Sequence, residues 1–516
     1  MKKYNIYMVL LVILLSVALA ACSFGDVREE VTDGVDVSSI LEKAQALCDN
    51  GRYEEGLDCY LDAMEKNVKS IDARLGAVRC QIELANYDIA AINLEMVQQL
   101  DPSRIEICQM YQLLSEKTGK MSYGQKAIAA AKEYGHQEIL DQIPQAPIFE
   151  SAGGNYGERV WLNITTADSD AKIYITLTND INNGANVSDY EYQTPIMLMR
   201  GRNIVSAYCC KDGISSELIT VTYNVNYPET EVQFREPLVE QLVRDTLGKR
   251  TGPITNYDCE GMEHFDWSVL QNTYTDYEEF QNLRISSLED LQYFPGITYL
   301  SLLWQDQITD YSPMQNCGLI YQLQIYDCNL TNVDFLEYVP NVSYLYVHQN
   351  KITDFSGLNY LNHLFNLQVN YNAEGGNIDE VLKNNKELFS LGFDDNQLTD
   401  YSLLAELEGL QSLEIRGFTY LDHAALASLE NLVDLSINYN YDRREYNKSI
   451  GDISFLQNMQ SLEYLYLNCV QNAEDLVYIQ NLPNLTTLYL YNCKATDNRD
   501  AMAMLTAALP KCSIYY

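Results

Sequence analysis

The stretch "NVSYLYVHQNKITDFS", from Asn341 to Ser356, carries the pattern that organises the C-terminal half of the chain. Leu345 is followed two residues later by Val347 and five residues later by Asn350. Alternation of apolar residues with polar or aromatic ones predicts a short strand whose leucine points into a core. The Asp-containing segment that follows is typical of a turn. The stretch therefore predicts one strand-and-turn unit.

This unit is one copy of a repeat with the form L-x-L-x-x-N-x-I/L-T-D. Its first leucine falls at Leu300, Leu323, Leu345, Leu367, Leu391, Leu413, Leu435, Leu465 and Leu488. Successive leucines are 22 to 24 residues apart, except for one spacing of 30 that contains the polar insertion "YDRREYNKSIGD". A fixed period of this length predicts units that stack into a solenoid and bury their apolar faces against each other.

The repeat resembles the leucine-rich repeat of internalin-type surface proteins over residues 280–512, most closely in "QITDYS", "KITDFS" and "QLTDYS". The resemblance implies parallel strands and an asparagine in each turn whose amide satisfies buried backbone groups. The asparagines at that place are Asn350, Asn372, Asn396 and Asn440. Gln305, Phe418 and Val470 hold the same place, so the asparagine ladder is expected to break at them.

The chain is unusually rich in tyrosine, with 40 tyrosines against 13 phenylalanines. On a strand, the neighbours of an inward leucine point to the opposite face, which in a solenoid is the concave sheet. The ligand-binding residues predicted on that face are Trp304, Tyr326, Tyr344, Tyr346, His348, Tyr371, Tyr439, Tyr464, Tyr466, Tyr489 and Tyr491. Charged residues such as Asp394, Glu414 and Arg416 interrupt them in the middle repeats. The competing interpretation is that cross-strand tyrosines only stiffen the sheet.

A different repeat, of 34 residues, occupies the first part of the chain. A small residue recurs at Gly56, Ala90 and Gly124, with Tyr53 or Tyr87 three residues before it in two of the units. A small residue lets two helices approach closely, and this pattern resembles the tetratricopeptide repeat. The resemblance implies helical hairpins that bind peptides or proteins, although a purely structural spacer fits the sequence equally well.

Pro144 and Pro147 end the helical pattern, and alternating runs such as "KIYITL" and "ITVTYNV" then predict strands up to Tyr227. The order of these runs resembles the chitobiase/β-hexosaminidase C-terminal-type domain, which implies a small accessory β-sandwich. The amphipathic segment "REPLVEQLVRDTLG" (235–248) follows and predicts a helix that caps the open end of the solenoid.

The N-terminal sequence has the features of an export signal. Two lysines precede an apolar run from Ile6 to Ala21, which is too short for a typical membrane span and fits a signal peptide. Leu19-Ala20-Ala21-Cys22 resembles the lipobox of bacterial lipoproteins. That resemblance implies lipidation of Cys22, whose two acyl chains suffice for stable anchoring.

Composition narrows the classes of function. A formal net charge of -38 argues against nucleic acid as a partner, because phosphate contacts need lysine and arginine. None of the five histidines belongs to a metal or catalytic motif, and no P-loop or G-x-S-x-G occurs. We therefore expect no enzyme, no catalytic residue, no metal site and no cofactor. The twelve cysteines after Cys22 suit neither a zinc site nor a compact disulfide scaffold.

These patterns together predict a multidomain chain: an all-α tetratricopeptide-like solenoid, a small β-sandwich, and an α/β leucine-rich repeat solenoid with parallel strands. The predicted boundaries are 1–21 for the signal peptide, 22–37 for a tether, 38–143 for the helical repeats, 144–227 for the sandwich, 228–290 for the cap and 291–516 for the leucine-rich repeats. The expected function is a bacterial lipoprotein, anchored outside the cell membrane, that binds a protein ligand on the concave face. The alternatives are a binder of glycan or cell-wall polymer, and an envelope scaffold acting through the helical repeats.

Overall fold

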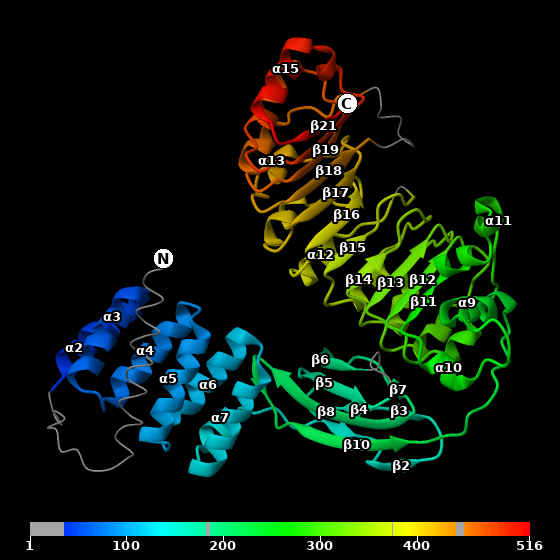
Figure 1. Ribbon diagram of the computed structural model, residues 1–516. Coiled ribbons are helices and arrows are strands. Elements are labelled where there is room, and N and C mark those ends of the chain that lie inside the picture. The colour runs from blue at the N-terminus through cyan, green and yellow to red at the C-terminus, as the bar shows by residue number, and fades with distance from the viewer. Residues whose placement is uncertain (1–35, 182–185, 374, 440–447) are drawn as a thin grey trace. The chain divides into compact units, whose positions relative to one another are not determined.

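The computed structural model describes residues 36–181, 186–373, 375–439 and 448–516 (Figure 1). The predicted signal peptide, Cys22, most of the tether and Asn440 lie outside these ranges. Contacts divide the chain into two units, one holding the helices up to Pro144 with Lys211–Glu217, the other holding Gln145–Cys210 and Leu218–Tyr516. Within the described ranges, no helix combines the length and apolar character needed to cross a membrane.

The first unit is built from helices that pack on their neighbours in sequence. They are α2 (Ser38–Asp49), α3 (Tyr53–Lys66), α4 (Ile71–Glu83), α5 (Tyr87–Leu100), α6 (Ile105–Thr118), α7 (Met121–Tyr134) and α8 (Gln137–Leu140), with the short strand β9 (Ile214–Ser215) in the second segment. Gly56 lies where a Cβ atom would come within 2.5 Å of the Cys48 sulfur. The repeated small residue therefore permits the close helix approach that the 34-residue period predicts. The tetratricopeptide-like assignment stays a prediction.

Two buried thiols meet beside this glycine. The sulfur atoms of Cys48 and Cys80 lie 3.1 Å apart, and burial is the main cause that raises the pKa of Cys80. All cysteines in the described residues are free thiols.

The second unit begins with short strands arranged in three sheets. The strands are β1 (Ile148–Phe149), β2 (Gly154–Tyr156), β3 (Val160–Leu162), β4 (Ile164–Thr165), β5 (Lys172–Asn179), β6 (Val187–Glu191), β7 (Ile196–Leu198), β8 (Gly201–Lys211) and β10 (Ile219–Val225). The main sheet has the order β2-β10-β8-β5-β6, and β1 pairs with β4 and β3 with β7. Side chains from all three sheets share one hydrophobic core. We call this part the β-domain.

The β-domain joins the solenoid through shared packing. Leu319, from the second repeat of the solenoid, is 1% exposed and belongs to the core of the β-domain. The Tyr190 hydroxyl donates to the Gly318 carbonyl at 2.7 Å, and the Arg159 guanidinium donates to the Gln292 carbonyl at 2.7 Å. These contacts join Gln145–Cys210 and Leu218–Tyr227 to the repeats in one unit, whereas Lys211–Glu217, also within the predicted range 144–227, belong to the helical unit.

A cap covers the first repeat. It contains α9 (Pro237–Leu247), α10 (Asn256–Glu260), β11 (His264–Asp266), η2 (Trp267–Asn272), α11 (Tyr277–Gln281) and η3 (Glu289–Tyr293). The predicted capping helix is present as α9, which has Pro237 in its first turn and ends at Gly248 with φ of 65°. Its buried residues Val239, Leu242 and Val243 join the solenoid core.

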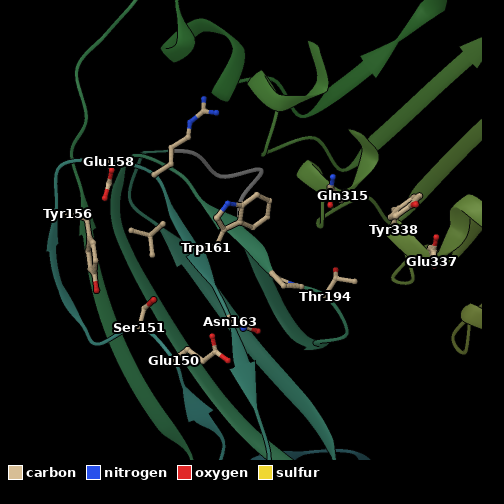
Figure 2. Close-up of a pocket in the computed structure, with 13 residues that line it drawn as sticks. Glu150, Ser151, Tyr156, Glu158, Trp161, Asn163, Thr194, Gln315, Glu337 and Tyr338 are labelled. Atoms are coloured by element: carbon tan, nitrogen blue, oxygen red, sulfur yellow. The ribbon is translucent and has the colours of Figure 1, made fainter. Parts of the chain in front are cut away.

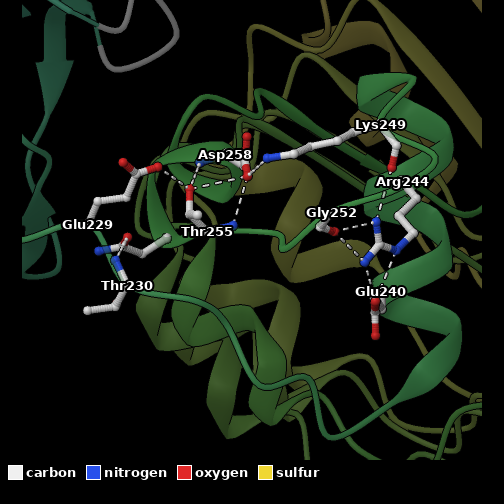
Figure 3. A network of polar contacts seen from close by, with 9 residues as sticks. Glu229, Thr230, Glu240, Arg244, Lys249, Gly252, Thr255 and Asp258 are labelled. Carbon is white, nitrogen blue, oxygen red and sulfur yellow. Dashed lines mark hydrogen bonds and ion pairs between the residues drawn. The ribbon is translucent and has the colours of Figure 1, made fainter.

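Polar contacts hold the cap loops in place, as Figure 3 shows. The Thr255 side chain accepts from the Asp258 amide, and Asp258 accepts from the Thr255 amide, which together form a capping box at the start of α10. Lys249 Nζ lies 2.6 Å from Asp258 Oδ2, and Arg244 pairs with Glu240 at 2.7 Å. The Lys249–Asp258 pair thereby links the segment after α9 to the start of α10.

The solenoid sheet has eleven strands in sequential order, β11 to β21 (Figure 1). After β11 come β12 (Tyr299–Leu303), β13 (Gln322–Tyr326), β14 (Tyr344–Tyr346), β15 (Asn366–Gln368), β16 (Ser390–Asp394), β17 (Ser412–Arg416), β18 (Asp434–Asn438), β19 (Tyr464–Asn468), β20 (Thr487–Tyr491) and β21 (Ser513–Tyr515). Neighbours are parallel, and the repeated leucines pair in register, as Leu345 does with Leu323 and Leu367. The predicted parallel leucine-rich solenoid is therefore present.

Short helices return the chain to the next strand. They are η4 (Ser312–Asn316), η5 (Asp334–Tyr338), η6 (Ser356–Tyr360), α12 (Asp379–Asn384), η7 (Tyr401–Glu406), α13 (His423–Leu426), η9 (Ser454–Asn458), η10 (Ala473–Asp475), α14 (Leu476–Gln480), η11 (Lys494–Asp497) and α15 (Arg499–Ala508). Their buried side chains and the strand leucines form one continuous core along the solenoid.

The turn ladder is more adaptable than the sequence suggests. Asn350 and Asn372 work as expected: Asn350 Nδ2 donates to the Ile325 and Val347 carbonyls, and Asn372 Nδ2 to the Val347 and Val369 carbonyls. Gln305, expected to break the ladder, instead continues it, with Nε2 donating to the Leu283 and Leu303 carbonyls and Oε1 accepting from the Ile285 amide. The expectation for Gln305 was wrong because a glutamine amide carries the same donor and acceptor atoms on a longer stem.

Other side chains also stand in for asparagine. The Cys328 and Cys493 sulfurs each accept from a backbone amide at 3.2 Å and donate to a carbonyl at 3.3 Å. In the fifth repeat Gln397, one residue after Asn396, donates to the Val369 carbonyl. Phe418 and Val470 fill the place with buried apolar side chains.

Candidate functional site

The candidate site is the strand face, which we define as the side of strands β12–β21 that points away from the leucine core. Strand pairing arranges its side chains in rows across the sheet: Tyr344 lies between Gln322 and Asn366, and Tyr346 between Gln324 and Gln368. The predicted site residues do not form continuous columns of rings. Most of them fall into two aromatic groups with a polar centre between them, whereas Tyr344, Tyr346 and Tyr439 belong to neither group.

The first aromatic group lies beside the cap and consists of Trp304, Tyr326 and His348 with Tyr277 and Phe280 of α11. The Trp304 ring meets Phe280 at 5.4 Å and Tyr326 at 6.2 Å between ring centroids, and Tyr326 meets His348 at 5.0 Å. Phe280 is 1% exposed, and Trp304 packs against the solenoid core. These rings mainly attach the cap to the sheet.

Backbone conformation explains why Trp304 and Tyr371 depart from the predicted alternation. Both follow the end of their strand, with φ of 59° and 58°. The alternation of side chains between two faces holds only for extended backbone, so it does not orient residues in a left-handed turn. Trp304 therefore turns toward α11, and Tyr371 lies under the guanidinium of Arg416.

His348 is also a packing residue. It is half-buried, its Nδ1 atom is buried without a hydrogen-bond partner in the described residues, and burial lowers its pKa. The neutral imidazole is therefore favoured in the folded protein.

Three rings that the sequence analysis did not predict join the predicted Tyr344 and extend the strand face at one edge. Tyr321, Tyr344, Phe365 and Phe389 are linked by ring centroid distances of 6.2, 5.5 and 5.0 Å. Tyr321 is 43% and Phe365 39% exposed. Tyr321, Phe365 and Phe389 each lie two residues before a repeated leucine, so their common position was the signal that could have revealed them.

The second aromatic group consists of Tyr464, Tyr466, Tyr489, Tyr491 and Tyr515 on β19, β20 and β21. Tyr489 stacks on Tyr515 at 4.6 Å, and lies 5.7 Å from Tyr464 and 5.8 Å from both Tyr466 and Tyr491. Tyr491 and Tyr515 are 41% and 47% exposed. In contrast to Trp304, these rings contact mainly each other, and they leave aromatic surface open to solvent.

The polar centre is a buried ion pair with a tyrosine beneath it. Arg416 Nη1 lies 3.3 Å from Asp394 Oδ1, and the two side chains are only 5% and 3% exposed. Asp394 also accepts from the amides of Tyr371 and Asn372, and the Arg416 guanidinium lies 4.6 Å from the Tyr371 ring. Burial raises the pKa of Asp394 despite the opposing effect of Arg416.

Two further carboxyl groups lie beside this pair on the strand face. Burial raises the pKa of both Glu414 and Asp434, and hydrogen bonds from Asn370 and Asn438 partly oppose the rise at Glu414. The remaining predicted residues, Tyr346 and Tyr439, are half-buried, and Tyr439 packs against the solenoid core. Among the described residues, no group of three or more His, Cys, Asp or Glu side chains could hold a metal ion.

No family model matches the chain. Among curated proteins it is similar to leucine-rich repeat-containing protein 23 of Bos taurus, at 31% identity over 221 residues, and of Homo sapiens, at 27% over 218 residues. The aligned parts cover 35% and 34% of this chain and 63% and 62% of those proteins. The chain thus spans about three fifths of the length of the curated relatives it matches.

Two solved structures are also similar. One is an internalin (inlF) from Listeria monocytogenes, with 24% identity, a TM-score of 0.38, and coverage of 55% of this chain and 95% of that chain. The other is an LRR protein from Leptospira interrogans, with 20% identity, a TM-score of 0.35, and coverage of 45% and 57%. The two curated relatives are named as leucine-rich repeat proteins, in agreement with the repeat described above.

Proposed function

We propose that the protein binds a protein ligand on the strand face of its solenoid, with the second aromatic group as the main contact. The observation that carries the proposal is the open ring surface on β19, β20 and β21, where Tyr489 stacks on Tyr515 and Tyr491 is 41% exposed. Tyrosine offers rigid contact area with a polar tip and is enriched among residues that dominate binding energy.

The extent of the strand face favours a protein over a sugar. From β13 to β21 the face spans eight strand spacings, or about 40 Å at roughly 4.8 Å per strand. Exposed rings lie toward both ends of this distance, at Tyr321 and at Tyr491, with carboxyl groups between them. A single glycan contact would use only one of the two ends, whereas a protein interface of standard size needs about 800 Å² on each partner.

We further propose that this binding takes place outside a bacterial cell membrane, with the protein held by a lipid on Cys22. The supporting observation is the sequence of the first 22 residues, in which an apolar run ends at Leu19-Ala20-Ala21-Cys22. Metabolic labelling with an alkyne fatty acid tests the anchor: wild type should be labelled, and Cys22→Ser should not.

The binding proposal is tested with one pair of variants and two ligand libraries. Soluble protein is applied to an array of bacterial and host surface proteins and, in parallel, to a glycan array. Wild type should bind a protein on the first array, and Tyr466→Ser/Tyr489→Ser should lose that binding. The matched control is Tyr360→Ser/Tyr420→Ser, because these tyrosines are 47% and 61% exposed but lie outside the strands.

The aromatic stack also suits a sugar ring, so the glycan array provides the decisive comparison. Binding to a glycan that Tyr466→Ser/Tyr489→Ser abolishes, without any protein ligand, would replace the protein proposal by the carbohydrate one. If Tyr466→Ser/Tyr489→Ser and Tyr360→Ser/Tyr420→Ser bind the protein ligand equally well, the second aromatic group is not the contact.

A further inference from the structure

A cavity lies away from the strand face, where the β-domain meets the first repeats of the solenoid. Its volume is about 680 Å³, within the range of roughly 300–1,000 Å³ that is typical of small-ligand sites. Its lining residues are Glu150, Ser151, Tyr156, Glu158, Arg159, Val160, Trp161, Asn163, Thr194, Pro195, Gln315, Glu337 and Tyr338. We call this cavity the junction cleft (Figure 2).

Trp161 provides an aromatic surface inside the junction cleft. It is the middle residue of β3, whose neighbours Val160 and Leu162 are buried in the β-domain core, so strand alternation directs the indole outward. The side chain remains 40% exposed. Figure 2 shows the indole directed into the space between the β-domain and the solenoid residues Gln315 and Tyr338.

The cleft carries an excess of negative charge. Three carboxylates, Glu150, Glu158 and Glu337, line it together with one guanidinium, so its formal charge is -3 + 1 = -2. The Arg159 guanidinium already has other contacts: it donates to the Gln292 carbonyl and lies 5.6 Å from the Tyr227 ring centroid. Within the described residues, neither Glu150 nor Glu158 forms an ion pair with a cationic side chain.

These carboxylates are too dispersed for an inorganic ion. No group of three or more acidic, histidine or cysteine side chains in the described ranges could hold a metal ion. Positive charges that match them must therefore be separated along an organic ligand. A neutral sugar would remove water from the carboxylates without neutralising them, which is costly.

We propose that the junction cleft binds a small alkylammonium ligand of the polyamine type, with one ammonium group over the Trp161 indole and others near Glu150, Glu158 and Glu337. An ammonium group donates hydrogen bonds and accepts none, so the carboxylates and the Ser151 and Asn163 side chains supply suitable acceptors. Cation–π attraction is strongest for tryptophan among the aromatic side chains.

Isothermal titration calorimetry of the full chain with spermidine tests the proposal. Wild type should bind spermidine. The affinity should fall as the salt concentration rises from about 50 to 500 mM, because salt screens the attraction between partly exposed charges. Trp161→Ala should weaken binding by about 2- to 30-fold, which corresponds to a cation–π contribution of roughly 0.5–2 kcal/mol. Glu158→Gln should also weaken it, and Glu150→Gln/Glu158→Gln more strongly.

Matched controls distinguish the cleft from the general acidity of the chain. Tyr420→Ala removes an aromatic ring that is 61% exposed outside the cleft, and Glu408→Gln removes an exposed solenoid carboxylate. Both variants should bind spermidine as wild type does. A Lys-Lys peptide with blocked ends is titrated in parallel, and tighter binding of spermidine than of the peptide identifies a free polyamine as the preferred source of the ammonium groups.

Three results would overturn the proposal: no heat with spermidine at millimolar concentration, equal binding by wild type and Trp161→Ala, or Trp161-dependent binding of cellotetraose in place of spermidine. Circular dichroism melting of each variant confirms that it is folded. The test is independent of the strand face, because none of these residues belongs to either aromatic group.

Discussion

The two aromatic groups of the strand face use the same residue types in different ways. Around Trp304, the indole packs on Phe280 of the cap and on Tyr326, so a neighbouring element covers it, while Tyr277 of the same group stays 59% exposed. Around Tyr489, rings stack on Tyr515 and Tyr466 and leave exposed surface. Tyr326 of the first group and Tyr491 of the second both lie three residues after their repeated leucine, so the place in the repeat does not separate packing from a binding surface.

The largest effect on stability is expected at the polar centre that lies between the two aromatic groups. Arg416→Ala leaves Asp394 as an unpaired buried charge, and the free energy of unfolding should fall by about 3–5 kcal/mol. Urea denaturation measures the change. Arg416→Met/Asp394→Asn removes both charges and should recover part of the loss; if the double variant is as unstable as Arg416→Ala, the buried charge is not the cause.

The next largest effect is a pH-dependent change in stability, expected in the cap beside the first aromatic group. Burial raises the pKa of Glu260, at the end of α10, to about 7, although Arg159 and Arg200 oppose the rise. A carboxyl group with a raised folded pKa binds more protons folded than unfolded, so its stabilising contribution is lost as pH rises from about 4.5 to about 7.

Removing that carboxyl group should therefore flatten the pH profile. A shift of this size corresponds to a loss of about 3 kcal/mol across the window, and Glu260→Gln should not show it. Urea denaturation of both proteins between pH 4 and 8 measures the difference. Parallel profiles for the two proteins would contradict the assignment to Glu260.

Trp304→Ala tests the packing role of the first group. Loss of a large ring between the cap and the sheet should lower the free energy of unfolding by about 2–3 kcal/mol, toward the low end for tryptophan because Trp304 is only half-buried. Thermal melting and hydrogen exchange at α11 measure the change. Unchanged exchange at α11 would show that Trp304 does not hold the cap.

The smallest effect on stability is expected in the second group. Tyr489→Ser removes a half-buried ring that packs on other tyrosines, so the free energy of unfolding should change by about 1 kcal/mol, while ligand binding is lost. Comparison with Trp304→Ala under the same conditions sharpens the contrast. A loss of stability at Tyr489 as large as that at Trp304 would mean that both groups are structural.

Much of the architecture followed from spacing in the sequence. The period of the leucines predicts parallel, in-register strands, and Leu323, Leu345 and Leu367 pair as that period requires. Turn chemistry was less predictable, because Gln305 and Cys328 offer the same donor and acceptor pattern as asparagine through different side chains.

The sequence by itself determined where inward and outward positions fall within each strand, because backbone alternation is a local property. Only the tertiary structure decided which outward rings remain open. Phe280 covers Trp304 from 24 residues away, Arg416 covers Tyr371 from 45 residues away, and Leu319 enters a core built by residues far earlier in the chain. Exposure depends on such distant neighbours, whose positions no local pattern records.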